Sequence, residues 1–374
     1  MNIRTHDSIN DTSEKNLILK LRELAGETDS AAAHPDKGIQ VFDSTMAQFI
    51  EENEDFCELL KLILNDRKIK LNHFASLLPR AAQFALRKRN IDDYAEFNRD
   101  KWKETLSTLV KDPAFIASLY NRQYATNRPY QRYKALAALS SALTNTPIRV
   151  YDLGCSLNTG LSGLLLEDFY SKTKDSFEDL TPNESIKTLL KKNNFEIHQA
   201  IGVDLQDLSI EEGIEWVIAC EYFGNYDRTK EALLRHNSLL SQNDDRLLTL
   251  TRDITDSSLP RLLKNAANNN SQRRIRTIVH ASMVFYQLTE AGQLAVVENI
   301  NQVLQAGDIF LELRFIDESD YYREYNMESV VKFKTSEGLS RDYQWLLWNS
   351  IYGERSKSGA DYDIVMEKLC ELAQ

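Results

Sequence analysis

Residues 149–160 combine the features expected of a loop that holds a nucleotide-like cofactor. An apolar, β-branched run ends in Asp152, and a small-residue turn follows: Gly154, Cys155 and Ser156. Small residues let the backbone approach a ligand, and the helix that follows points its positive end at that ligand. A carboxylate here would repel an anionic pyrophosphate, but a cofactor with an ammonium and a cationic sulfonium tolerates it. The turn therefore favours a sulfonium cofactor over a dinucleotide.

Two further strand ends carry carboxylates that suit an adenosyl group. Asp204, followed by Leu205, is placed to accept hydrogen bonds from ribose hydroxyls, and Asp253 can accept from an adenine amino group. Ile254 would give the ring an apolar contact. Ligands of parallel sheets bind at the carboxyl ends of the strands, so these residues should meet there. An acid at a single strand end is more often a turn or helix cap, which is the alternative interpretation of each.

The first strand end would hold the rest of this cofactor. Asp152 is expected to pair with its ammonium, and the backbone around Gly154, Cys155 and Ser156 to approach its methionine portion. The turn departs from a glycine-rich pattern at Ser156 and Asn158. Asparagine tolerates a left-handed backbone, so the shape of the turn can survive.

His280 is the candidate catalytic residue. It ends the fourth predicted strand, where an acceptor pocket would open, and imidazole titrates near neutral pH. It could therefore remove a proton from a methyl acceptor. Tyr286 follows the same strand and could line the acceptor site. The alternatives are a histidine satisfied by the backbone and a tyrosine packed in the core.

The segment 121–133 is dense in arginine and tyrosine and lies just before the first strand. Arg128 or Arg132 could hold a cofactor carboxylate bidentately, and Tyr124 and Tyr130 could bind the acceptor. The alternative is a solvated helix start, with Pro129 near its first turn.

Composition restricts the class of protein. The 374 residues carry a formal net charge of -11, which disfavours a nucleic-acid partner. The four cysteines are scattered without metal-ligand spacing, which argues against a zinc site and fits a reducing compartment. The first 20 residues do not resemble a signal peptide, and no apolar run is long enough to span a bilayer. A cytoplasmic protein with no membrane partner is expected. Its oligomeric state stays open, including a homo-oligomer.

Hydrophobic patterning changes near residue 143. Residues 42–143 show helical spacing with a break expected near Pro79, and they predict a helical N-terminal cap domain over 1–143. Beyond it, strands alternate with helices, which predicts a parallel α/β sheet with helices on both faces over 144–374. The expected strands are 148–153, 200–205, 247–252, 276–281 and 308–315, closed by an antiparallel pair at 330–335 and 343–348. Expected helices include 214–223, 226–240, 290–303 and 362–372, and the polar segment 171–194 is interpreted as an insertion.

Residues 152–158 and 202–204 resemble the first and second motifs of the class I S-adenosylmethionine-dependent methyltransferases. The resemblance implies a Rossmann-like sheet and S-adenosyl-L-methionine as cofactor. A narrower resemblance, over roughly residues 70–315, is to a bacterial methyltransferase-like family of unknown function. It adds Asn127 with the segment after it, and the strand end Val279 to Ser282.

The sequence therefore predicts transfer of a methyl group to an oxygen or nitrogen of a small-molecule acceptor. No NPPY-like tetrapeptide ends the fourth strand, which disfavours DNA or protein amides as acceptors. One alternative is a protein that binds S-adenosylmethionine or S-adenosylhomocysteine without catalysis. Another is a nicotinamide-dependent oxidoreductase, against which both Asp152 and the spacing of the turn count.

Overall fold

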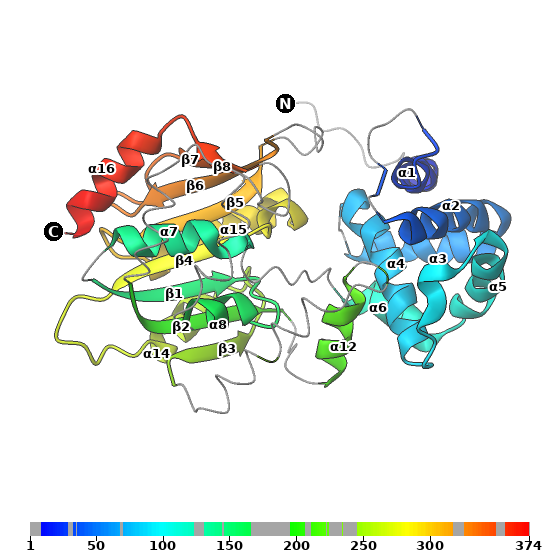
Figure 1. Cartoon of the computed structure of the whole chain (residues 1–374), viewed down its shortest axis with the longest axis horizontal. Helices are drawn as coiled ribbons and strands as arrows, with labels where there is room; N and C mark the ends of the chain where they lie inside the picture. The colour runs from blue at the N-terminus through cyan, green and yellow to red at the C-terminus, as the bar shows by residue number, and fades with distance from the viewer. Residues whose placement is uncertain are drawn as a thin grey trace. The chain divides into compact units, whose positions relative to one another are not determined.

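The computed structural model shows a chain that divides into two compact units (Figure 1). The first comprises residues 1–126 and 211–226, and the second comprises residues 127–210 and 227–374. The structure describes residues 9–28, 33–34, 36–67, 70–122, 131–143, 146–165, 195–205, 211–221, 223, 234, 245–316, 325–348 and 356–373. In these parts of the chain no helix is long and apolar enough to cross a membrane.

The first unit is helical throughout its described residues. Side-chain oxygens cap several of its helices: Asp36 accepts from the Ile39 amide, Asn53 from Phe56, Asn98 from Lys101 and Asp112 from Ala114. Its helices are α1 Ile9–Leu24, α2 Lys37–Glu52, α3 Glu54–Arg67, α4 Leu71–Arg87, η1 Asp93–Glu96, α5 Arg99–Leu109 and α6 Pro113–Asn121. The helical character expected for this region is confirmed.

Helix α4 runs without interruption through Pro79, so the expected break there is wrong. Proline removes the backbone donor that would bond to the carbonyl four residues earlier, which normally kinks a helix. Here, however, every side chain from Phe74 to Leu86 except Ser76 is buried. Packing on nearly all sides of this stretch keeps the helix continuous despite the lost hydrogen bond.

Helix α12, Glu211–Ala219, belongs to the helical unit although it follows the second strand of the sheet in sequence. Figure 1 shows it in green beside α4 and α6. Its buried Trp216 packs edge-on against Phe84, with the ring centroids 5.6 Å apart. Gln83 of α4 donates to the carbonyls of Ala219 and Glu221, at 2.6 and 3.2 Å. The helical unit is therefore completed by a segment inserted from the sheet unit.

The second unit contains an eight-stranded sheet in the order β3-β2-β1-β4-β5-β6-β7-β8. Its parallel strands are β1 Pro147–Leu153, β2 Glu196–Asp204, β3 Leu247–Thr251, β4 Arg276–Ser282 and β5 Ile309–Phe315. The strands β6 Met327–Phe333, β7 Tyr343–Trp348 and β8 Ser356–Ser358 extend it in antiparallel fashion. The strand order reverses between β1 and β4, which is where such sheets bind ligands.

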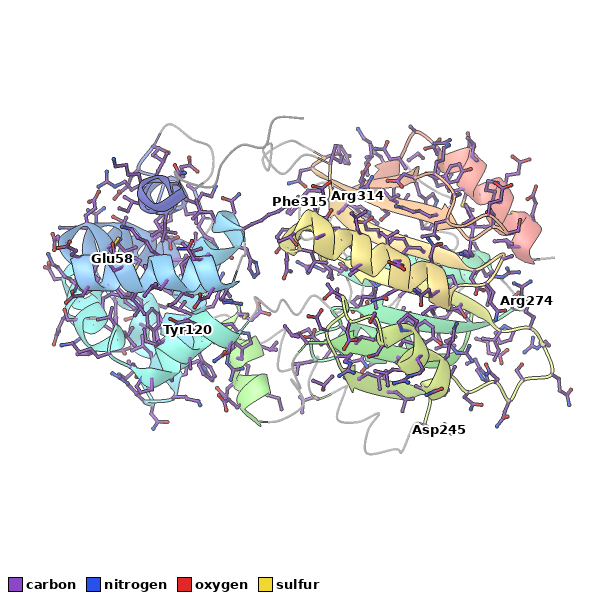
Figure 2. The ribbon with its side chains drawn as sticks, turned by 180° about the vertical axis from the view of Figure 1, so that it is seen from behind. Glu58, Tyr120, Asp245, Arg274, Arg314 and Phe315 are labelled. Atoms are coloured by element: carbon purple, nitrogen blue, oxygen red, sulfur yellow. The ribbon has the colours of Figure 1, made fainter. Side chains whose placement is uncertain are left out.

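Helices cover both faces of this sheet. One face carries η2 Gln131–Tyr133, α7 Lys134–Ala142, α8 Thr159–Leu165 and α16 Tyr362–Ala373, and the opposite face, seen in front in Figure 2, carries α14 Leu259–Ala266 and α15 Glu290–Val303. Two separate apolar clusters correspond to these faces. Consecutive β1 residues alternate between them: Val150 packs in the first cluster and Tyr151 in the second. This doubly wound α/β architecture is the one predicted.

The predicted strands all occur, with ends that differ by a few residues, and α15 and α16 lie where helices were expected. The short strand β8 was not predicted. The insertion at 171–194 lies outside the described residues, as does nearly all of the expected helix 226–240. The domain boundary near residue 143 stays a prediction, although α7 groups with the sheet and α12 with the helices.

Candidate functional site

The candidate site is built on the carboxyl ends of three neighbouring strands. In the register of the sheet, Asp152 on β1 lies beside Gly202 on β2 and beside His280 on β4. Figure 2 labels Arg314 and Phe315 at the corresponding end of β5, and Arg274 and Asp245 toward the opposite edge.

The turn after β1 has an unusual backbone. Gly154, Ser156 and Asn158 all have positive φ angles, of 74°, 53° and 58°. Non-glycine residues adopt this region at a cost, so the surroundings must hold the turn in place. The Gly154 amide donates to the Val203 carbonyl at 2.8 Å. The Ser156 amide donates to a carboxylate oxygen of Asp204 at 2.9 Å. The ends of β1 and β2 are thereby joined.

Asn158 explains how the turn persists without a glycine at that position. Its side chain is buried, and its amide group donates to the Leu248 carbonyl at 3.0 Å and to the Thr249 hydroxyl at 3.1 Å. These bonds to β3 compensate for the strained backbone. The left-handed shape expected from the tolerance of asparagine is present.

Asp152 is part of a buried polar group with His280 and Tyr133. The Nδ1 atom of His280 lies 2.8 Å from one carboxylate oxygen of Asp152, and the hydroxyl of Tyr133 donates to the other. Asp152 is 1% exposed and His280 is 0% exposed. Both carboxylate oxygens are thus occupied inside the protein, although the ammonium contact predicted for Asp152 is not itself tested.

Tyr133 was missed by the sequence reasoning. Its ring lies 5.0 Å from the His280 ring, centroid to centroid, and covers Gly160 of α8, where any Cβ would collide with it. Burial raises the pKa of Tyr133 well above its ordinary value, and the Asp152 carboxylate raises it further. The hydroxyl therefore stays protonated and donating. Its position at the end of the tyrosine-rich segment was visible, but no local pattern distinguishes it from the other tyrosines.

Cys155 is a buried residue of the turn after β1. Burial raises the pKa of its thiol well above the usual range, and Asp204 and Asp152 raise it further. The thiol therefore remains neutral. Its predicted contribution to cofactor binding is through the backbone of the turn and stays untested.

Asp204 and Leu205 lie at the end of β2, where the sequence placed them. Asp204 is partly buried, and the apolar side chain of Leu205 is 48% exposed. A carboxylate can accept several hydrogen bonds at once, so accepting from the Ser156 amide does not prevent Asp204 from accepting from ribose hydroxyls.

Asp253 and Ile254 follow β3. One oxygen of the exposed Asp253 carboxylate accepts from both the amide and the hydroxyl of Thr255, at 2.8 Å each. Asp253 therefore forms a local turn, as the alternative interpretation of an acid at a single strand end predicts. The Ile254 side chain packs in the apolar cluster under α14 and α15. Their predicted contacts with adenine stay predictions, and this geometry supports them less than it supports the role of Asp204.

Tyr286 lies in the short helix η3, Phe285–Gln287. Its ring packs against Phe315 at the end of β5, with centroids 5.6 Å apart, and joins the apolar cluster of the α7 face. Arg128, Tyr124 and Tyr130 lie outside the described residues. The segment that contains them leads directly into Tyr133.

At the end of β5, charged side chains pair among themselves. Arg314 lies 2.9 Å from Glu328, 2.8 Å from Asp342 and 3.5 Å from the buried Glu312. Burial raises the pKa of Glu312, against the influence of Arg314. These charged groups form an ion-pair network among β5, β6 and the residue that precedes β7. The network belongs to these strands and not to the turn after β1.

Four buried polar atoms at the site have no hydrogen-bond partner among the described residues. They are Ser156 Oγ and Asn158 Oδ1 in the turn, and His280 Nε2 and Ser282 Oγ at the end of β4. Leaving a buried polar atom unsatisfied costs about 1–3 kcal/mol, and most such atoms in proteins are paired. Their presence on neighbouring strand ends fits a site that a polar ligand completes.

Comparisons with known proteins give only distant likenesses. No protein-family model and no curated protein matches the sequence. Among solved structures, PKMT2 from Rickettsia typhi, in complex with AdoHcy, is 14% identical with a TM-score of 0.27, over 53% of this chain and 28% of that one. An O-methyltransferase family protein from Burkholderia thailandensis is 10% identical with a TM-score of 0.30, over 79% of this chain and 58% of that one.

A third likeness is to an S-adenosylmethionine-dependent methyltransferase from Clostridium acetobutylicum, 10% identical with a TM-score of 0.24 over 66% of this chain and 80% of that one. The chain therefore spans less than two thirds of the first two proteins. Scores this low decide neither cofactor nor acceptor, which are inferred below from this chain's own residues. The narrower resemblance to a bacterial family has no matching family model and stays a prediction.

Proposed function

We propose that the chain is an S-adenosylmethionine-dependent methyltransferase that acts on an oxygen or nitrogen of a small-molecule acceptor. The observation that carries this proposal is the left-handed turn after β1. The Ser156 amide in this turn donates to Asp204, and buried polar atoms at the same strand ends have no hydrogen-bond partner among the described residues. A protein that needed this turn only for folding would gain nothing from leaving these atoms without partners.

The residues present suit the cofactor. Asp204 would accept the ribose hydroxyls, and its charge would exclude a 2′-phosphate. Leu205 and Asp253 would contact the adenine, the first through its exposed apolar surface. The backbone of Gly154 to Ser156 would hold the amino-acid portion, together with Arg128. When bound, S-adenosylmethionine supplies an electrophilic methyl group.

His280 is the proposed proton acceptor. Its Nδ1 is held by Asp152, so its second nitrogen is the one that can take a proton from an acceptor. Because Nε2 is buried, an acceptor must displace its present neighbours to reach it. Tyr286, Tyr124 and Tyr130 are proposed to line the acceptor side.

A second candidate function is binding of S-adenosylmethionine or S-adenosylhomocysteine without catalysis. The full burial of His280 favours it, since a base must reach its substrate. Ser156 and Asn158 also favour it, because their side chains leave a ligand less room in the turn than glycines would.

Product formation separates the two candidates. The purified protein is incubated with methyl-labelled S-adenosylmethionine and a panel of small hydroxyl, carboxyl and amine acceptors, and labelled product is measured. Methyl transfer should depend on both Asp204 and His280, with His280→Ala lowering turnover about 10²–10⁴-fold. Tight cofactor binding with no labelled product across the panel would favour the binding protein. Unchanged turnover in His280→Ala would remove it as the base.

A further inference from the structure

The buried group formed by Tyr133, Asp152 and His280 has a chemical consequence for the histidine. A carboxylate has no donor of its own, so the short contact between Asp152 and Nδ1 of His280 requires the proton to be on Nδ1. In the neutral ring, Nε2 then carries a lone pair. It is this acceptor nitrogen that lies buried without a partner.

Tyr133 completes the arrangement from the other side of the carboxylate. Its hydroxyl donates to the second oxygen of Asp152, and its ring packs over both His280 and Gly160. The carboxylate is therefore fixed between two donors from different elements, β4 and η2. Two further titratable groups act electrostatically on this buried group: Asp152 raises the pKa of the Cys155 thiol, and Arg132 lowers the pKa of Tyr133 against the larger effect of burial.

We infer that Asp152 is a positioning residue, which holds His280 as the Nδ1–H tautomer so that Nε2 is the basic nitrogen, while Tyr133 only fixes the second oxygen of the Asp152 carboxylate. The inference rests on the proposed function for its purpose, since a base is needed only if an acceptor loses a proton. In the transfer, the acceptor's O–H or N–H proton moves to Nε2 as the acceptor's lone pair bonds to the methyl group. The bond between the methyl group and the sulfonium breaks with its electrons going to sulfur. Asp152 stays a carboxylate and stabilises the imidazolium that forms.

This assignment gives Asp152 a role different from a bond to the cofactor's ammonium. The two roles predict different effects on binding. If Asp152 only positions His280, Asp152→Asn should change the affinity for S-adenosylhomocysteine by less than about threefold. If it binds the ammonium directly, loss of a charged hydrogen bond should weaken binding by about tenfold or more.

The tautomer itself is measured in the ligand-free protein by long-range ¹H–¹⁵N correlation spectra of ¹⁵N-histidine-labelled samples at pH 8. His280→Gln identifies the signals, and His198, whose Nε2 lies 3.0 Å from the Asn268 carbonyl at the other end of the sheet, is the internal reference. We expect wild type to show a protonated Nδ1 and an unprotonated Nε2. A protonated Nε2 in wild type would overturn the inference.

Two variants test the cause. Tyr133→Phe keeps the ring and the pair of Asp152 with His280, so the Nδ1–H tautomer should persist. In Asp152→Asn the amide oxygen can accept from Tyr133 while its NH₂ group faces Nδ1, so the ring should change to the Nε2–H tautomer. An unchanged tautomer in a folded Asp152→Asn protein would contradict the inference. If that variant does not fold, the wild-type and Tyr133→Phe spectra still decide it. Absence of S-adenosylhomocysteine binding by wild type would reject the proposed cofactor and leave the tautomer result standing.

Discussion

Each unit of the chain contains an aspartate that is only 1% exposed, and the two aspartates differ in their hydrogen-bond partners. Asp152 in the sheet unit is 1% exposed and accepts hydrogen bonds from Tyr133 and His280. Asp43, on α2 of the helical unit, is also 1% exposed, but its Oδ1 has no hydrogen-bond partner among the described residues. Burial raises the pKa of Asp43 well above its usual range; Arg80 opposes this shift and Asp36 adds to it.

The difference shows that burial alone does not mark a functional carboxylate. Asp152 is surrounded by donors that its charge can use, and it can in turn act on a neighbouring imidazole. Burial of Asp43 favours the neutral acid, and its Oδ1 accepts no hydrogen bond from the described residues. The candidate site therefore belongs to the sheet unit, and the helical unit carries a buried acid that works against its stability at neutral pH.

The largest expected effect is that of removing the Asp152 carboxylate. Asp152→Ala leaves two buried donors without an acceptor and should lower the free energy of unfolding of the sheet unit by about 3–5 kcal/mol. Hydrogen exchange of the β1 and β4 amides measures it. Asp245→Ala, at an exposed position before β3, is the control and should stay within about 0.5 kcal/mol of wild type. A loss below 1 kcal/mol would show that Asp152 is not held as described.

The opposite sign is expected for Asp43. Asp43→Asn should raise the free energy of unfolding of the helical unit at pH 7 by about 2 kcal/mol, because the neutral amide removes the cost of burying an ionisable carboxyl whose Oδ1 has no hydrogen-bond partner among the described residues. Exchange of the α2 and α4 amides reports this unit separately from the sheet. A decrease in the free energy of unfolding would mean that the Asp43 carboxylate stabilises the helical unit through Arg80. That result would contradict the contrast between the two aspartates.

The Asp43 carboxyl should also make the free energy of unfolding of the helical unit depend on pH. This pH-dependent change should be no larger than the increase in free energy of unfolding expected for Asp43→Asn. A pKa raised in the folded state means that the folded protein binds the proton more tightly than the unfolded chain. The stabilisation is therefore complete below about pH 4, the unfolded value, and is lost as the pH rises through the folded pKa. Unfolding of wild type and Asp43→Asn between pH 4 and pH 8 should show a difference that grows with pH. A constant difference would contradict the shift.

The smallest effect concerns Tyr133. Tyr133→Phe keeps the ring on Gly160 and His280 and removes only one hydrogen bond, so it should lower the stability of the sheet unit by about 1 kcal/mol. Denaturant unfolding followed at α7 and α8 tests this. A loss as large as that of Asp152→Ala would mean that the hydroxyl, rather than the carboxylate, organises the buried group.

Much of the sheet unit could be predicted from the sequence because its signals are local. Apolar runs of strand length ended at Asp152, Asp204 and His280, and parallel strands bring their ends to one edge. Positive φ angles at Ser156 and Asn158 also followed from the residue types and their position in the turn.

What was missed depends on contacts between distant parts of the chain. Nothing near Tyr133 indicates that it, rather than a neighbouring tyrosine, bonds to a residue 19 positions away. Helix α12 has an ordinary amphipathic pattern, and its place in the helical unit depends on contacts with residues distant in sequence, such as Phe84 on α4 and Arg122 after α6. Pro79 predicts a break on local grounds, which packing overrides.

The central claim is that the strand ends of the sheet unit bind an adenosyl sulfonium through Asp204. Isothermal titration calorimetry with S-adenosylmethionine, S-adenosylhomocysteine and NADH tests it most directly, on wild type, Asp204→Ala, Asp204→Asn and the control Asp245→Ala. We predict binding of both adenosyl ligands and not of NADH. Asp204→Ala should weaken binding by about 1.5–3 kcal/mol, Asp204→Asn by less because it can still accept from the Ser156 amide, and Asp245→Ala should bind as wild type does. A folded wild-type protein that ignores both adenosyl ligands, or an Asp204→Ala protein of undiminished affinity, would contradict the account.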